Sequence, residues 1–204
     1  MQEFRKFGFF KCKMSQNKGM SESLIRRIRN RDQRAMGELY QRYVGRLTSV
    51  CRRYVPQEAD AKDVLQESFV KIFTALPTIE WRDEPSFEGW MVRIVVNESL
   101  RLLRNQHRLT FVEIDDAQDR LPDEDPDAEL LSPDELHCLV SALPDGYRTV
   151  VNLYVFEGYS HQQIAQLLGI RPGTSASQLH HAKRLLAKRI KHLTFDISHL
   201  TFDI

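Results

Sequence analysis

The residues Ser160-His-Gln-Gln-Ile-Ala-Gln-Leu-Leu-Gly-Ile-Arg-Pro-Gly173 carry the clearest local signals of helix starts and ends in the C-terminal part of the chain. Ser160 and Gln163 have the spacing of a capping box, in which each side chain hydrogen-bonds the backbone N–H of the other residue at a helix start. The helix that follows has an apolar side made of Ile164, Ala165, Leu167 and Leu168. Gly169 favours a left-handed C-cap and Pro172 cannot continue the helix, so the stretch predicts a short helix followed by a tight turn.

A second helix is predicted from a cap at Thr174 to about Ile190. At about 100° per residue, one side of it carries Leu179, Ala182, Leu186 and Ile190. The other side offers hydrogen-bond donors and cations, which suit a DNA major groove. The candidate DNA-contacting residues are Thr174, Ser175, Ser177, Gln178, His181, Arg184 and Lys188. The two helices form a helix-turn-helix, which binds DNA in many proteins and is a plain structural module in others.

Charge is segregated along the chain, although the net formal charge is only +1. Residues 1–108 hold 21 Lys and Arg against 13 Asp and Glu, and residues 136–204 hold 7 against 4. Residues 109–135 hold one Arg against 11 acidic residues, with three prolines among them. Such a strip cannot bury enough apolar surface to fold alone, so we expect an extended linker between two basic domains.

Helical periodicity dominates residues 21–108, and no segment there shows the sustained alternation of a strand. The core-facing stripe is predicted to contain Leu24, Ile28, Met36, Leu39, Tyr40, Tyr43, Val44 and Leu47. The sequence therefore predicts an all-α protein with two small helical domains, residues 21–108 and 133–191, joined by a flexible acidic linker at residues 109–132.

A further helix is predicted to open after Pro56, near Asp60. Its apolar side gathers Leu65, Phe69, Ile72 and Leu76. The opposite side carries Asp63, Gln66, Glu67 and Val70. That polar side is either a solvated face or a docking surface, and composition does not decide between the two.

Residues 81–86 are predicted to be a loop, and Phe87 to begin a helix that ends near Arg108. The basic end of this helix suits the negative end of the helix dipole, or contacts with phosphates. Its aromatic residue makes the loop a candidate site for single-stranded DNA or an unstacked base. A role as a core anchor is favoured for Trp90, and both roles stay open for Trp81.

Several collinear segments resemble a sigma factor of the extracytoplasmic-function (ECF) group in the sigma-70 family. Asp60-Ala-Lys-Asp-Val-Leu-Gln-Glu67, continued to Phe73, resembles region 2.2. The helix from Phe87 to Arg108 resembles regions 2.3 and 2.4. Region 4 is matched by residues 142–148, 158–169 and 173–186, so the resemblance covers about residues 21–191. The chain departs from the family pattern at Lys62, where an acidic residue is common, and at Gln178 and His181, where arginines are common.

The resemblance implies a subunit that binds core RNA polymerase and directs promoter recognition. It places Asp63, Gln66, Glu67, Phe69 and Phe73 against the β′ clamp helices. It assigns recognition and opening of the −10 element, with capture of an unstacked base, to Trp81, Arg82, Ser86, Arg93, Asn97, Arg101 and Arg104. The second domain is then expected to read the −35 element as duplex DNA and to touch the β flap. An anti-sigma factor, often membrane-bound in this group, is implied as a further partner.

Other classes of function find little support in the sequence. The three cysteines lie far apart, and His180 and His181 are about 100° apart on a helix, so no metal site is expected. No P-loop glycine run or Gly-x-Ser-x-Gly elbow occurs, so we expect neither enzymatic activity nor a cofactor. A cytoplasmic protein is expected, because no long apolar run or secretory signal is present. The main alternative to a sigma factor is a stand-alone helix-turn-helix regulator.

The two ends of the chain stand outside these patterns. Residues 1–20 are predicted to be disordered or a start-site extension. His192-Leu-Thr-Phe-Asp-Ile197 recurs as His199-Leu-Thr-Phe-Asp-Ile204 in the C-terminal tail, residues 192–204. The seven-residue spacing suits a helix, whereas Thr, Phe and Ile favour a strand. The repeat is interpreted as a duplication without a role or, alternatively, as an interaction segment.

Overall fold

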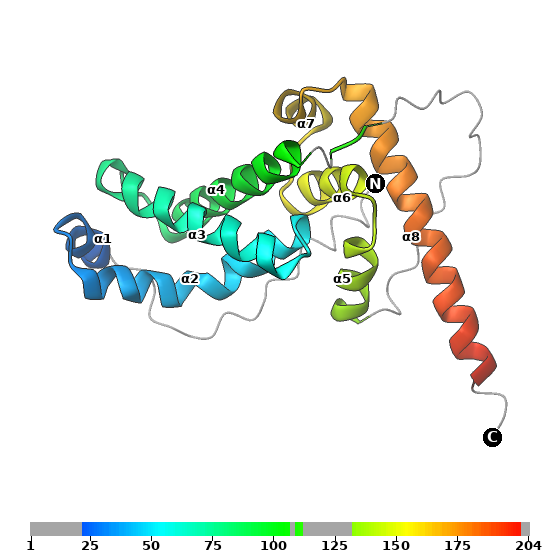
Figure 1. The fold of residues 1–204 in the computed structure, drawn as a ribbon, viewed down its shortest axis with the longest axis horizontal. Coiled ribbons are helices and arrows are strands. Elements are labelled where there is room, and N and C mark those ends of the chain that lie inside the picture. The colour runs from blue at the N-terminus through cyan, green and yellow to red at the C-terminus, as the bar shows by residue number, and fades with distance from the viewer. Residues whose placement is uncertain (1–21, 107–108, 112–131, 201–204) are drawn as a thin grey trace. The chain divides into compact units, whose positions relative to one another are not determined.

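The computed structural model describes residues 22–106, 109–111 and 132–200. These residues fall into two compact units, residues 22–106 and the remainder. Every regular element within the described ranges is a helix (Figure 1), which confirms the predicted all-α fold with two helical units. The predicted N-terminal extension, most of the predicted linker and residues 201–204 lie outside the described residues.

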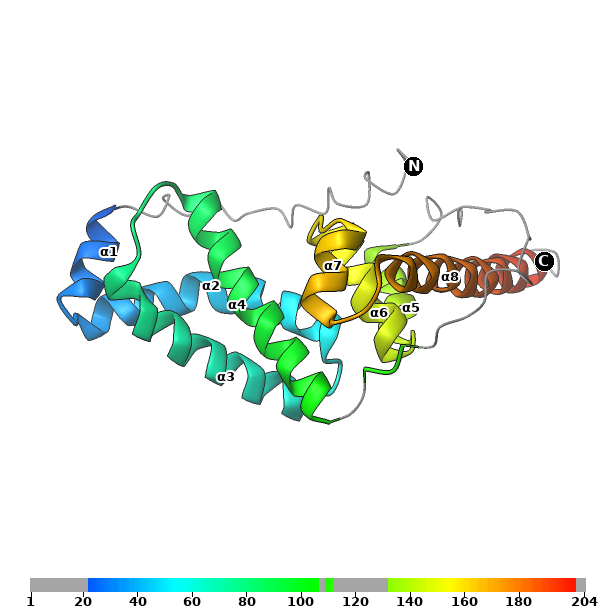
Figure 2. The same cartoon turned by 90° about the horizontal axis from the view of Figure 1, so that it is seen from above.

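The first unit is a bundle of three helices, α2 (Gln33–Tyr54), α3 (Glu58–Ala75) and α4 (Glu84–Asn105), each packed against the other two. The shorter α1 (Glu22–Arg29) packs against α2 and against η2, a 3-10 turn at Leu76–Thr78. Figure 2 shows α1 at the end of the bundle where α3 ends. The loop from residue 79 to residue 83 then leads from this end to the start of α4.

The core of the first unit largely follows the predicted stripe. Five of its members are buried: Leu24, Ile28, Leu39, Tyr43 and Leu47. Met36 and Val44 are half-buried. The prediction is wrong for Tyr40, which is 40% exposed. Tyr40 lies at the edge of the stripe and packs against the ring of Phe69. Of the predicted apolar side of the next helix, Phe69 and Ile72 of α3 and Leu76 of η2 are buried, and Leu65 is half-buried.

Helix α4 begins at Glu84, three residues before the predicted start at Phe87. Asp83 is the N-cap, and its carboxylate accepts a hydrogen bond from Ser86 N–H at 2.7 Å. Pro85 occupies the first turn, where its missing N–H costs nothing and its fixed φ favours the helix. The sequence Asp-Glu-Pro-Ser is therefore a helix start, and only residues 79–83 form the loop.

The second unit packs α6 (Asp145–Val151) and α7 (His161–Leu168) against α8 (Pro172–Leu200). The helix α5 (Pro133–Ser141) also contacts α8, and Ser132 and Glu135 form a capping box at its start. Helix α6 continues into η4, a π-helical segment at Asn152–Phe156. The short segment 109–111 reaches this unit, because the backbone carbonyl of Thr110 lies close to Gly146 on α6.

The predicted helix-turn-helix is confirmed in α7 and α8. Gln163 N–H donates to Ser160 Oγ at 3.3 Å, and Ser160 N–H donates to Gln163 Oε1 at 2.8 Å. Gly169 closes α7 with a φ of 71°, in the left-handed region that glycine adopts without steric cost. The predicted cap at Thr174 is wrong, because α8 already begins at Pro172, a favoured residue at the first helical position.

Helix α8 continues past the predicted end at Ile190 to Leu200 (Figure 1). The backbone of the first copy of the repeat, residues 192–197, is therefore helical. None of the helices in the described ranges is long and apolar enough to cross a membrane.

Candidate functional site

A cavity of about 370 Å³ opens beside the first turn of α4. It is lined by Ile79, Glu80, Arg82, Ser86, Phe87 and Trp90. Two of these residues, Arg82 and Ser86, were predicted site residues. The other four were not predicted. They flank the predicted loop in the sequence, and this proximity is the signal that could have identified them. The cavity combines aromatic faces with charged and hydroxyl groups, which is the chemistry that holds a nucleobase.

Aromatic rings support one wall of this cavity. Phe87 is buried, and the centroid of its ring lies 5.4 Å from that of Trp90 and 5.7 Å from that of Trp81. Tyr43 of α2 packs edge-on against the same ring at 6.1 Å. Trp81 therefore packs against the wall from the loop side, while Trp90 both packs on Phe87 and lines the cavity.

Two polar contacts fix the first turns of α4 to α2. Tyr43 donates a hydrogen bond to Glu84 at 3.1 Å, and Arg46 pairs with Glu88 at 3.0 Å. Burial, together with the charge of Glu84, raises the pKa of Tyr43, so its phenol stays a donor at neutral pH. At the start of α4, the hydrogen bonds from Ser86 lower the pKa of Asp83, so the capping carboxylate stays ionised.

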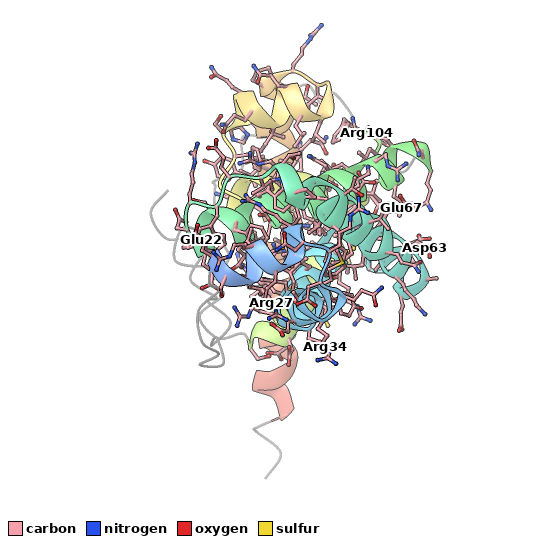
Figure 3. All side chains as sticks on the ribbon, turned by 90° about the vertical axis from the view of Figure 1, so that its left-hand side faces the viewer. Glu22, Arg27, Arg34, Asp63, Glu67 and Arg104 are labelled. Carbon is pink, nitrogen blue, oxygen red and sulfur yellow. The ribbon has the colours of Figure 1, made fainter. Side chains whose placement is uncertain are left out.

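The predicted strand-binding residues of α4 lie beyond the cavity along the helix. Arg93, Asn97 and Arg104 are exposed, and Arg104 projects from α4 in Figure 3. Arg104 Nε donates to the Leu100 carbonyl at 3.3 Å. Arg101 differs from them, because its guanidinium pairs with Glu98 at 2.8 Å and lies 3.9 Å from Glu67.

Glu98 is the centre of a charged cluster between α3 and α4. Glu98 is only 6% exposed, and its carboxylate accepts hydrogen bonds from Lys71 of α3 and from Arg101. Burial acts to raise the pKa of Glu98, but the hydrogen bonds and charges of Lys71 and Arg101 outweigh it and lower that pKa. The cluster thus joins a predicted strand-binding arginine to the helix that carries the predicted docking face.

On α3 the three polar docking candidates Asp63, Gln66 and Glu67 are exposed. Asp63 and Glu67 project from the same side of the bundle in Figure 3. Phe73 is half-buried, and Phe69 is buried under Tyr40, with 4.7 Å between their ring centroids. Phe69 therefore supports this surface from below. Val70, 62% exposed, and Tyr40 add apolar area that the predicted site residues did not include.

The residues predicted to contact DNA from α8 divide into two groups. Thr174, Ser175, Ser177 and Gln178 are buried, whereas His181 and Arg184 are half-buried and Lys188 is exposed. Ser175 Oγ lies 3.0 Å from Nδ1 of His161 on α7, and Ser177 donates to the Thr174 carbonyl. A β-carbon on Gly146 would lie 3.4 Å from the Gln178 amide oxygen, so Gln178 lies against α6.

Several residues at the start of α8 remain accessible. Arg171, Gly173 and Ala176 are exposed, and His180 and Lys183 are half-buried. His161 stacks on Tyr154, with 4.6 Å between the ring centroids, and burial lowers the pKa of His161. His181 stacks more loosely on Tyr147 of α6, at 6.2 Å. The accessible cations near the turn are Arg171, Lys183 and Arg184.

These features define a helical DNA-binding factor with a helix-turn-helix unit and a second unit that carries an aromatic cavity. Two models of known protein families match the sequence and are consistent with this class of protein. The family model described as "Sigma-70 region 2" matches residues 39–109, and the model described as "Sigma-70, region 4" matches residues 134–186.

Three relatives of known function are similar to the chain. The ECF RNA polymerase sigma factor SigE of Mycolicibacterium smegmatis is 31% identical over 163 residues, which cover 76% of this chain and 62% of that protein. The ECF RNA polymerase sigma-E factor of Haemophilus influenzae is 31% identical over 185 residues, covering 84% and 96%. That of Escherichia coli is 28% identical over 182 residues, covering 83% and 94%. A solved structure of CnrH in complex with the cytosolic domain of CnrY has 24% identity and a TM-score of 0.45, and covers 83% of this chain and 96% of that chain.

The chain belongs to the sigma-70 family, in its ECF group. It is an alternative sigma factor that directs transcription initiation, and sigma factors of this family work with core RNA polymerase and promoter DNA. The alternative of a stand-alone helix-turn-helix regulator is not favoured, because the region 2 match accounts for the first unit as well.

Proposed function

We propose that the cavity beside α4 captures one unstacked base of the −10 non-template strand. The observation that carries this proposal is the combination of Phe87 and Trp90 with Arg82 and Ser86 around one cavity of about 370 Å³. The half-buried ring of Trp90, supported by buried Phe87, stacks with any base, and the polar groups select one base by hydrogen bonding to its edge. An unstacked base is thereby withdrawn from the duplex, which favours strand opening at that position.

The strand that leads to the cavity follows the exposed side of α4. Arg93, Asn97 and Arg104 lie on this side and contact its phosphates and sugars. Arg101 contributes less than these residues to DNA affinity, because Glu98 and Glu67 already neutralise its charge. Trp81 and Arg82 complete the site from the loop.

Abortive transcription by core polymerase, with and without this protein, tests the proposed function on promoter fragments from the source genome. Initiation at discrete sites that depends on both components supports it and identifies the −10 and −35 sequences. If the protein supports no initiation on any of these fragments, no −10 strand is opened and the proposed base capture fails.

The exposed side of α3 is the proposed docking surface for the β′ clamp helices. Asp63, Gln66 and Glu67 supply its polar part, and Phe73, supported by buried Phe69, supplies apolar area. Replacing both Gln66 and Glu67 by Ala should weaken polymerase binding without unfolding the protein. The loss of the Glu67–Arg101 contact costs little, since both side chains are more than half exposed.

A matched control for this surface is available on the same helix. Gln57 and Glu58 have the same residue types and are exposed at the start of α3. The variant with Ala at both positions should retain polymerase affinity in a titration of labelled protein with core enzyme. Equal affinity of the wild type and of the Gln66→Ala, Glu67→Ala variant would refute the docking assignment.

The second unit is proposed to read the −35 element through the start of α8 and to touch the β flap. Arg184, His181 and Lys188 are the predicted residues that are at least partly accessible, and Lys183 and Arg171 extend this set. Thr174, Ser175, Ser177 and Gln178 have their side chains buried, so we assign them the task of positioning α8. Arg184→Ala should weaken duplex binding at all sequences and reduce its salt dependence by about one counterion.

The remaining assignments concern the domains and a regulator. Residues 21–108 act as region 2, residues 133–191 as region 4, and residues 109–132 as the acidic tether that runs through the RNA exit path. Two basic domains on such a tether suit an anti-sigma factor that holds both domains at once. Recovery of the protein from its native cells with polymerase and with no other stoichiometric partner would count against this regulator.

A further inference from the structure

The two walls of the cavity are held in different ways. The α4 wall, with Ser86, Phe87 and Trp90, is fixed to α2 by the hydrogen bond from Tyr43 and the ion pair of Arg46. The other wall, with Ile79, Glu80 and Arg82, belongs to a loop without regular structure. The position of this loop decides the width of the cavity.

Arg29, the last residue of α1, reaches this loop. Its guanidinium donates a hydrogen bond to the backbone carbonyl of Ile79, a residue that lines the cavity. The Ile79 N–H donates to the Leu76 carbonyl of η2 at 3.4 Å, and α1 itself packs against η2. The residue at the edge of the cavity is therefore tied to α1 by a side chain and to η2 by its backbone.

The helix that carries Arg29 is itself held in place. Leu24, Ile25 and Ile28 of α1 are buried. Arg27 pairs with Asp32 at 2.8 Å and with Glu38 of α2 at 3.2 Å. Asp32 caps α2 by accepting from Arg34 N–H and Ala35 N–H, so α1 and α2 share one fixed junction. A hydrogen bond from α1 can therefore set the position of the loop.

We infer that Arg29 is a positioning residue for base selection: it fixes the loop wall of the cavity, so that the captured base meets a site of defined width. This inference rests on the proposed capture of a base by the cavity. Arg29 touches no base in this role and acts through Ile79. Its loss should widen the range of loop positions and weaken only the part of DNA affinity that depends on the captured base.

The test uses holoenzyme reconstituted from the full chain and core polymerase. The probes are fork-junction DNAs that carry the non-template −10 strand of a promoter mapped for this protein, either intact or with an abasic site at one position at a time. For the wild type, an abasic site at the captured position should lower affinity about tenfold or more, since base stacking is lost. The abasic ratio is the affinity for the intact probe divided by the affinity for the abasic probe. In Arg29→Ala the abasic ratio should fall about three- to tenfold, the range expected from one hydrogen bond, while affinity for the abasic probe stays unchanged.

Two further variants complete the test. Arg26→Ala removes an exposed arginine from the same helix and should keep the wild-type ratio. Arg29→Lys keeps a donor that can reach a carbonyl and should restore much of the ratio. Thermal melting shows that each variant is folded.

Three results would overturn the inference. If Arg29→Ala retains the full abasic ratio, Arg29 does not position the loop. If it weakens binding to intact and abasic probes equally, Arg29 acts as a general phosphate contact. If the wild type shows no abasic effect at any position, the proposed base capture itself fails, and the inference fails with it.

Discussion

In the first unit, the polar side chains predicted to meet partners stay on the surface of α3 and α4, whereas in the second unit several polar side chains predicted to meet DNA are turned inward from α8. Asp63, Gln66 and Glu67 are exposed, while Ser175 and Gln178 are buried. The difference follows from packing. Helix α8 is contacted by α5, α6 and α7, so less of its circumference is free than in an amphipathic helix that is covered on one side.

The contact between residues 109–111 and α6 is the strongest point at which to break the second unit. A β-carbon on Gly146 would lie 2.5 Å from the backbone carbonyl oxygen of Thr110. Because that atom is backbone and cannot rotate away, Gly146→Ala should destabilise the second unit by about 2–3 kcal/mol. Urea unfolding followed by circular dichroism measures the loss. Fluorescence of Trp81 and Trp90 reports the first unit separately, because the chain has only these two tryptophans.

Gly89 on α4 provides the opposite case in the first unit. Nothing lies within 4 Å of a β-carbon at this position, so Gly89→Ala should stabilise the helix by up to about 1 kcal/mol. If Gly146→Ala unfolds at the same urea concentration as the wild type, residues 109–111 do not pack on α6 as described.

The charged cluster at Glu98 tests the first unit in the same way. Glu98→Ala leaves Lys71 and Arg101 without their shared carboxylate. A broken buried ion pair costs about 3–5 kcal/mol, but both cations are about half exposed, so we expect a loss of about 2 kcal/mol. Tryptophan fluorescence during urea unfolding measures this loss, because both tryptophans lie in the first unit. The part of the circular-dichroism transition that occurs without a change in tryptophan fluorescence reports the second unit, and it should not shift.

The pH dependence of this loss follows from the lowered pKa of Glu98. A carboxyl whose pKa is lowered in the folded state stabilises fully above its unfolded pKa, ordinarily about 4.5, and less as the pH falls through the folded value. Glu98→Gln, which keeps the volume and one acceptor, should therefore differ from the wild type at pH 7 and match it in strong acid. An equal difference at both pH values would contradict the role of the charge.

The sequence predicts apolar positions in both units well, because burial of apolar side chains follows the helical period. Leu179, Ala182, Leu186 and Ile190 are all buried as expected. The helix start at Ser160 and the C-cap at Gly169 are also predicted, since their signals are local. Burial of Ser175 depends on His161, fourteen residues away, and periodicity carries no information about such a polar pair. The same holds for the cavity, which needs the tertiary contacts of Phe87 with Tyr43 and Trp81.

The junction between α1 and α2 offers a change that should strengthen the first unit alone. Arg31 has a φ of 60°, a left-handed conformation that costs a residue with a β-carbon about 1–2 kcal/mol. Arg31→Gly removes this cost but adds unfolded-state entropy, so we expect a gain of about 0.5–1 kcal/mol. Thermal melting followed by tryptophan fluorescence measures it. Asn30→Gly, at a neighbouring position without a positive φ, should give no gain, and a gain of equal size there would show that the conformation of Arg31 is not the cause.

The smallest expected difference between the units is their response to mild acid. His161 of the second unit is half-buried, stacks on Tyr154 and lies beside Ser175. Burial disfavours its protonated form, so its pKa is lowered from the ordinary value of 6.5. Because the folded state binds a proton less readily than the unfolded state, the stability that depends on neutral His161 is complete above pH 6.5 and falls as the pH drops below it.

We therefore expect the second unit to lose less than about 1 kcal/mol between pH 7.5 and pH 5.5, before the carboxylates of the first unit begin to lose their contribution. His161→Gln should remove this pH dependence, whereas His137→Gln, at an exposed position on α5, should keep it. An NMR titration of the imidazole gives the pKa directly. A value for His161 at or above the ordinary 6.5 would mean that the stacked, half-buried geometry does not govern its protonation, and the two units would then respond to mild acid alike.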